Sequence, residues 1–139
     1  MSREILFRGM FRGKRTDNGE WINDSEIYIR DGDGIWLSDE DLHVVTVQED
    51  TVGQYTGLTD KNGVKIYEGD IVRVNLFGNA YYPWKIVYSD KDAAFEFFRY
   101  VAVGIYGGKA TGHAKMSAYN KSQIEVIGNI HDNPEMLED

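Results

Sequence analysis

Hydrophobic and polar residues alternate over short distances along this chain, as is typical of β-strands with one buried face. Turn-forming residues separate the runs at 17–19, 31–34 and 60–63. The runs predict strands at Ile5–Phe7, from Trp21 onward, and at Ile27–Ile29, Ile35–Leu37, His43–Val47, Val64–Tyr67, Ile71–Val74, Trp84–Tyr88, Ala94–Tyr100 continuing to Val103, and Ile124–Ile127. No stretch keeps helical spacing over three turns, so the pattern favours a small barrel or sandwich.

The pattern also predicts the segments between the strands. Ser38 to Asp41 is expected to form one capped helical turn, and Asn133 with Pro134 is expected to begin a short C-terminal one. Segments 77–83 and 104–112 are predicted to be loops. The acidic content falls near residues 50–55, which places a boundary between a β-rich N-terminal region, 1–53, and a second domain, 54–139.

Charge and composition narrow the range of functions. The net charge is -8, and residues 1–50 hold 6 basic against 12 acidic residues, compared with 9 against 11 in the remainder. Because non-specific nucleic-acid binding depends on neutralised phosphates, an acidic chain is a poor candidate for it. One basic set near the N-terminus forms an exception: Arg3, Arg8, Arg12, Lys14 and Arg15.

The absence of cysteine excludes thiol chemistry and zinc sites built on thiolates. The first residues lack the apolar stretch of a signal peptide, and no run reaches the ~18 apolar residues of a membrane span. A soluble protein of the reducing cytoplasm is therefore expected, with no membrane partner.

The turn from Asp31 to Gly34 carries alternate carboxylates, as a calcium-binding loop does. It lacks the rest of that pattern, because Ile35 occupies the third ligand position and Trp36 replaces the required glycine. A solvated hairpin turn is favoured.

The segment 104–111 has the glycine content of a phosphate-binding loop. Its spacing fails, because Val103 stands where the first glycine is needed and Ala110 follows Lys109 in place of Ser or Thr. A loop between strands is the better interpretation.

The three histidines, His43, His113 and His131, have no close-spaced partner, so a metal site would require all three to converge in the fold. His113 and Ser117 could belong to a catalytic triad, but no nucleophile-elbow glycines surround Ser117. The sequence therefore predicts no catalytic residue, no metal and no cofactor.

Three aromatic residues next to a proline, Tyr81, Tyr82 and Trp84, form the most promising binding segment. Tyrosine and tryptophan are favoured anchors at interfaces. The alternative is that one or two of these rings cover the end of the core or begin the next strand.

Three ordered segments resemble the YopX family of phage and prophage proteins. They are Arg3 to Arg8, Gln54 to Val72 with its Leu58-Thr59-Asp60-Lys61-Asn62-Gly63 and Ile66-Tyr67-Glu68-Gly69-Asp70 stretches, and Val126 to Glu135. The resemblance implies a mainly β protein with a C-terminal SH3-like β-barrel, preceded by a smaller β-rich region, and it carries no known catalytic or binding residue.

Together these features predict a non-enzymatic binding or assembly protein that contacts a host or phage protein in the bacterial cytoplasm, with self-association left open. The alternative is a module for single-stranded DNA or RNA that uses the N-terminal basic residues or the aromatic segment from Tyr81 to Trp84.

Overall fold

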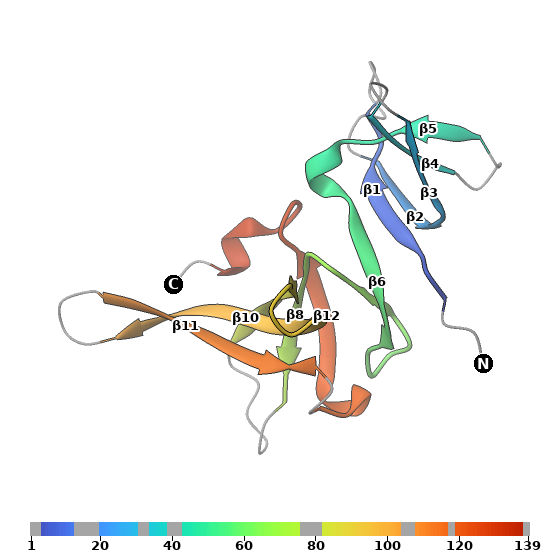
Figure 1. Ribbon diagram of the computed structural model, residues 1–139. Coiled ribbons are helices and arrows are strands. Elements are labelled where there is room, and N and C mark those ends of the chain that lie inside the picture. The colour runs from blue at the N-terminus through green and yellow to red at the C-terminus, as the bar shows by residue number, and fades with distance from the viewer. Residues whose placement is uncertain are drawn as a thin grey trace. The chain divides into compact units, whose positions relative to one another are not determined.

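The computed structural model in Figure 1 describes residues 4–12, 20–30, 34–38, 43–75, 82–103, 108–116 and 119–137. The chain divides into two compact units, Met1–Gly57 and Leu58–Asp139. Strands dominate both, and the described residues contain short 3₁₀ turns but no α-helix. The prediction of a mainly β protein is therefore confirmed.

The first unit contains two groups of short antiparallel strands. In one group, β1 (Phe7–Met10) pairs with β2 (Trp21–Ser25) on one side and with the start of β6 (Gly53–Thr59) on the other. The other group is a meander of β3 (Ile27–Arg30), β4 (Gly34–Ser38) and β5 (Val44–Thr46).

The core of the first unit is small and closely packed. Leu37 and Val47 are buried, and a Cβ atom on Gly9 would lie 3.2 Å from Val47 Cβ. The 3₁₀ turn η1 (Glu49–Thr51) adds Thr51, whose hydroxyl donates to the Gln48 carbonyl and accepts from the Met10 N–H at 2.8 Å. These contacts place β1 against the connection that leads to β6.

The second unit is built on a five-stranded antiparallel sheet with the order β11-β10-β9-β8-β12. Its elements are β7 (Lys65–Tyr67), β8 (Asp70–Val74), β9 (Pro83–Ser89), β10 (Ala94–Val103), β11 (Gly108–Lys115), η3 (Lys121–Gln123), β12 (Ile124–Asn129) and η4 (Pro134–Leu137). In Figure 1, β10 and β11 form a long hairpin.

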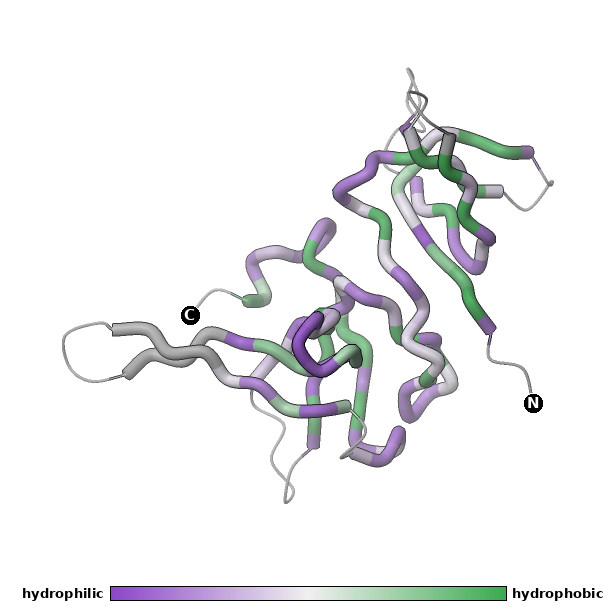
Figure 2. Tube along the Cα trace, in the orientation of Figure 1, coloured by the Kyte–Doolittle hydropathy of each residue, from purple (hydrophilic) through white to green (hydrophobic). Residues whose placement is uncertain are grey.

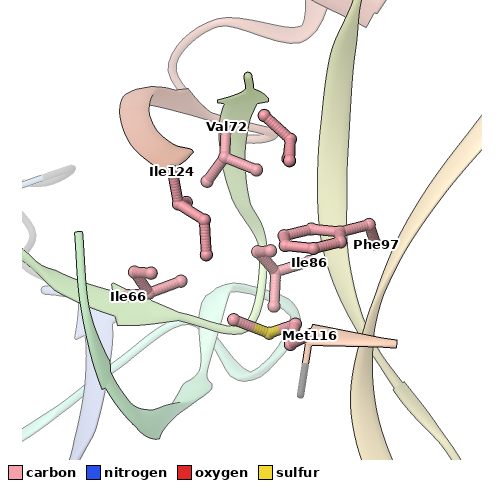
Figure 3. Packing of buried hydrophobic residues seen from close by; sticks show 7 residues of the cluster. Ile66, Val72, Ile86, Phe97, Met116 and Ile124 are labelled. Carbon is pink, nitrogen blue, oxygen red and sulfur yellow. The ribbon is translucent and has the colours of Figure 1, made fainter. Parts of the chain in front are cut away.

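The core of the second unit lies on one face of this sheet. The strands contribute alternate apolar residues to it, as Figure 2 shows by the change between hydrophobic and hydrophilic positions along the trace. The buried members, most of them labelled in Figure 3, are Ile66, Val72, Val74, Ile86, Phe97, Met116 and Ile124. Phe97 and the half-buried Tyr119 meet edge to face, with ring centroids 5.4 Å apart.

One prediction about secondary structure was wrong in part, and one strand was not predicted. Segment 104–112 was expected to be a loop, but β11 begins at Gly108 and pairs with β10 along its whole length. The strand β6 was not predicted at all. Both strands are rich in glycine and polar residues, so cross-strand pairing and not local propensity determines their conformation. The helical turn expected at Ser38 to Asp41 falls largely outside the described residues.

Candidate functional site

The predicted aromatic segment lies at the start of β9. Tyr82, just before the strand, is 59% exposed, whereas Trp84, its second residue, is half-buried and packs against the core of the second unit. Tyr81 lies outside the described residues. Tyr82 thus has the exposure of a contact residue, while Trp84 also covers the end of the core.

Arg99 of β10 joins these two aromatic residues. Its Cζ atom lies 3.9 Å from the centre of the Tyr82 ring and 5.5 Å from the Trp84 ring. Both distances fall within the range of cation–π attraction, and the shorter one is a direct stack. We call Tyr82, Trp84 and Arg99 the Arg99 cluster.

Sequence reasoning missed Arg99, although a signal for it exists. Phe95 and Phe97 face the core, and residues alternate between the two faces of a strand. Arg99 therefore continues the core-facing series at the point where the core ends. A charged residue at a position where the alternation predicts an apolar one indicates that the strand has reached the edge of the core.

The surroundings of Arg99 differ on its two sides. Trp84 and Tyr82 cover it on the β9 side, but its partner across the β10–β11 pair is Gly112, which has no side chain. The next residue of β11 on the same face is Ala114, which packs against the core. The Nε atom of Arg99 is buried and has no hydrogen-bond partner in the described part of the chain.

The opposite face of the same strands carries a second group of residues. Lys85 and His113 are the cross-strand neighbours of Phe98 in β10. The Lys85 Nζ lies 5.0 Å from the centre of the Phe98 ring, and the His113 ring meets Phe98 edge to face at 5.0 Å. Glu96 is buried, and its Oε1 lies 2.8 Å from His113 Nδ1. We call Lys85, Phe98 and His113 the Phe98 row.

The other residues considered from the sequence do not form a site in the described ranges. Within those ranges no three His, Asp or Glu side chains come together as metal ligands. His113 contacts Glu96 and Phe98, and Ser117 lies outside the described residues, as do the acidic turn 31–33 and segment 104–107.

The N-terminal basic residues are described only in part. Arg8 is only 9% exposed, and its guanidinium lies 4.9 Å from the centre of the Trp21 ring. A buried side chain of this kind does not contribute to an exposed cationic edge. Arg3, Lys14 and Arg15 lie outside the described residues.

The two longer segments that carry the family resemblance are Gln54 to Val72 and Val126 to Glu135. Carboxylates of the first segment accept hydrogen bonds from backbone N–H groups. The carboxylate of Asp60, 2% exposed, accepts hydrogen bonds from the N–H groups of Asn62, Val64 and Val126 at 2.8 to 2.9 Å. Asp70 accepts one from Tyr67 N at 2.8 Å. These contacts close turns, so we assign the two residues to the scaffold.

The electrostatics of Asp60 agree with a structural role. Burial alone would raise the pKa of its carboxyl group, but the backbone hydrogen bonds from Val126, Val64 and Asn62 and the charge of Lys61 together lower that pKa. The ionised form of the carboxylate is thus favoured by its own turn and strand partners.

In the last of these segments, Val126 to Glu135, asparagine side chains also accept hydrogen bonds from backbone N–H groups. Asn129 Oδ1 accepts from the N–H groups of His131 and Asp132 at 3.0 and 2.9 Å, and Asn133 Oδ1 accepts from Asn129 N at 3.3 Å. The helical turn η4 follows at Pro134. The side chain of Asn133, expected to cap that turn, bonds back to the end of β12.

The arrangement of the Arg99 cluster is suited to binding. Its guanidinium supplies planar N–H donors, and the two rings beside it supply apolar faces. No helix in the described part of the chain is long and apolar enough to cross a membrane.

Comparison with known proteins agrees with the fold. No curated protein sequence matches the chain. The crystal structure of protein EF1440 from Enterococcus faecalis is similar, with a TM-score of 0.58 and 24% identity over 99% of this chain and 100% of that one. The family model described as YopX protein matches residues 10–138, which is nearly the whole length. The chain therefore belongs to the YopX family.

Proposed function

We propose that this YopX-family chain is a non-enzymatic binding protein that acts through protein contacts, and that the Arg99 cluster is its contact surface. The observation that supports this most is the stack of the exposed Tyr82 ring on the Arg99 guanidinium at 3.9 Å. Tyrosine, tryptophan and arginine are the residue types most enriched among energetically dominant interface residues. Their combination here is held in place by strands β9 and β10.

The biological setting is part of the same proposal. We place the protein in the cytoplasm of a bacterial host, encoded by a phage or prophage, and we propose an SH3-like barrel for the second unit. The support is the family resemblance together with an antiparallel sheet of short strands around one core.

A second candidate function is binding of single-stranded nucleic acid by the Phe98 row. An aromatic ring with cationic neighbours on a sheet face is suited to base stacking and phosphate contact. The carboxylate of Glu96 beside His113 and the net charge of -8 both oppose the approach of a polyanion. Protein contacts are therefore the better-supported function.

Affinity capture from a lysate of the organism that encodes the protein tests the two functions together. Wild type, Tyr82→Ser and Arg99→Met are compared, with and without nuclease treatment. Tyr88→Ser is the matched control, because Tyr88 is an exposed tyrosine of the same strand, outside the Arg99 cluster.

The proposal predicts one or more proteins that are retained by wild type and Tyr88→Ser after nuclease treatment and lost with the two cluster variants. Retention of the same proteins by all four would show that the contact surface lies elsewhere. Loss of all captured material on nuclease treatment would favour the Phe98 row and nucleic acid.

A further inference from the structure

The guanidinium of Arg99 retains hydrogen-bonding capacity that the protein does not use. Its Cζ atom lies over the Tyr82 and Trp84 rings, and these ring contacts use none of the N–H donors, which lie in the plane of a guanidinium. The buried Nε has no acceptor among the described residues. Because buried donors are nearly always paired in native proteins, an unpaired one requires an explanation.

The side of Arg99 that faces β11 is lined by small residues. The residue opposite Arg99 across that strand pair is Gly112, and the next one on the same face is the small Ala114. Larger side chains at these positions would fill the space beside the guanidinium. The strand pairing therefore places Gly112 and Ala114 on the β11 side of Arg99, while the two rings contact the cation from the β9 side.

The group that fits this arrangement is an oxyanion with two oxygens. A carboxylate accepts two parallel hydrogen bonds from the edge of a guanidinium, and such pairs are both strong and directional. A phosphate has the same chemistry. The two sources differ in the charge that accompanies them, because nucleic acid brings a dense row of phosphates.

The charge of this protein favours a carboxylate from a protein over the phosphates of a nucleic acid. The second unit holds 9 basic and 11 acidic residues, and the whole chain has a net charge of -8. The net negative charge of the chain opposes the approach of a polyanion, whereas one carboxylate needs only one cation. The Tyr82 and Trp84 rings also provide apolar area that suits a peptide.

We infer that Arg99 is the receptor for a single carboxylate on a partner protein, seated between the Tyr82–Trp84 rings and the bare backbone at Gly112. The inference rests on the proposed function and deepens it, since it specifies the chemistry of the partner. Arg99 supplies the charge and the paired donors, Tyr82 stacks on the guanidinium, and Gly112 adds no side chain beside it.

Nuclear magnetic resonance of the arginine side chains tests this directly, because the Nε–H proton of Arg99 reports on its acceptor. The full-length protein is titrated with a capped tetrapeptide that contains two glutamates, and with the same peptide carrying glutamines. Arg73 serves as the internal control, since it is an exposed arginine of β8 in the same unit. Inorganic phosphate and a single-stranded oligonucleotide are the other probes.

A saturable downfield shift of the Arg99 Nε–H signal with the glutamate peptide, absent with the glutamine peptide and at Arg73, is the expected result. An equal response at both arginines, or none up to millimolar peptide, would overturn the inference. A tighter response to the oligonucleotide than to the peptide would also overturn it and assign the site to phosphate.

Two substitutions separate this inference from the proposed function. Gly112→Val fills the space beside Arg99 with a residue that favours strands, and Arg99→Lys keeps the charge but loses the paired donors. Each is expected to weaken glutamate-peptide binding by about tenfold or more, with unchanged thermal unfolding.

If captured proteins still depend on Tyr82 while the peptide does not bind, the proposed function stands and the carboxylate inference fails. If the peptide binds but the Arg99 cluster variants still capture the same proteins, Arg99 binds a carboxylate but the Arg99 cluster is not the contact surface for those proteins.

Discussion

The carboxylate of Asp60 accepts a hydrogen bond from the backbone N–H of Val126, with Oδ2 and N 2.9 Å apart, although the two residues are 66 positions apart in the chain. The same carboxylate also fixes its own turn through the N–H groups of Asn62 and Val64. Beside it, Lys61 donates its N–H to the Ile124 carbonyl, and its ammonium pairs with Glu125. One buried side chain thus joins the first turn of the second unit to its last strand.

Replacing Asp60 by asparagine is expected to destabilise the protein by about 1–3 kcal/mol, because one carboxylate oxygen becomes an amide donor and leaves a buried N–H without an acceptor. Asp60→Ala is expected to cost more, since all three N–H groups lose their acceptor. Urea unfolding followed by circular dichroism measures both. Asp90→Asn, at an exposed turn, is the control, and a variant at position 60 as stable as that control would contradict the role of Asp60.

The stability contributed by Asp60 is expected to depend on pH. Its pKa is lowered from an unperturbed value of 3.8, so below that value the unfolded chain binds more protons than the folded one. The contribution is therefore fully present above about pH 4 and is lost as the pH falls through the folded-state pKa.

Unfolding free energies of wild type and Asp60→Asn, measured from pH 7 to pH 3, test this sign. The difference between the two proteins is expected to stay constant above about pH 4 and to shrink below it. A difference that grows on acidification would show that the folded state does not favour the ionised carboxylate.

The hydrophobic pattern predicted the strands that contribute to the core, such as those containing Ile71 and Ile86, because burial of one face leaves a direct trace in the sequence. The pattern did not reveal β11, where pairing with β10 overrides the low strand propensity of glycine and lysine. Local sequence cannot report a preference that only a neighbouring strand creates.

The candidate site was also predicted only in part. Tyr82 and Trp84 were found from their residue types, but Arg99 lies 15 positions beyond Trp84 and meets it only through the pairing of β9 with β10. The register of a hairpin depends on its turn and on both strands together. Identifying the cluster therefore required the structure.

Gly69 has a backbone φ of +91° in the turn between Tyr67 and Asp70, a region that disfavours residues with a Cβ atom. Gly69→Ala is expected to lower the free energy of unfolding by roughly 1–2 kcal/mol. Gly69→Asn is expected to cost less, since asparagine tolerates this conformation better. Chemical unfolding of the three proteins gives the ranking, and an alanine variant as stable as wild type would show that the turn can change its conformation at no cost.

The side chain of Asn133 lies so close to Gly128 that no side chain fits at position 128 unless Asn133 moves. A Cβ atom at position 128 would lie 2.5 Å from Asn133 Oδ1 and 2.9 Å from its Cγ, so the Asn133 side chain must move. Movement breaks its hydrogen bond from Asn129 N, which joins the end of β12 to the start of η4. Gly128→Ala is therefore expected to destabilise the protein by about 1–2 kcal/mol.

A double-mutant cycle distinguishes this steric cause from a general effect of alanine at position 128. Asn133→Ala removes the obstructing atoms, so Gly128→Ala is expected to cost little in that background, and the two substitutions are expected to show an interaction energy of about 1 kcal/mol. Thermal unfolding of the four proteins provides the measurement. Strictly additive effects would mean that the Asn133 side chain yields to the new methyl group, and that its bond to Asn129 contributes little to holding η4 against the end of β12.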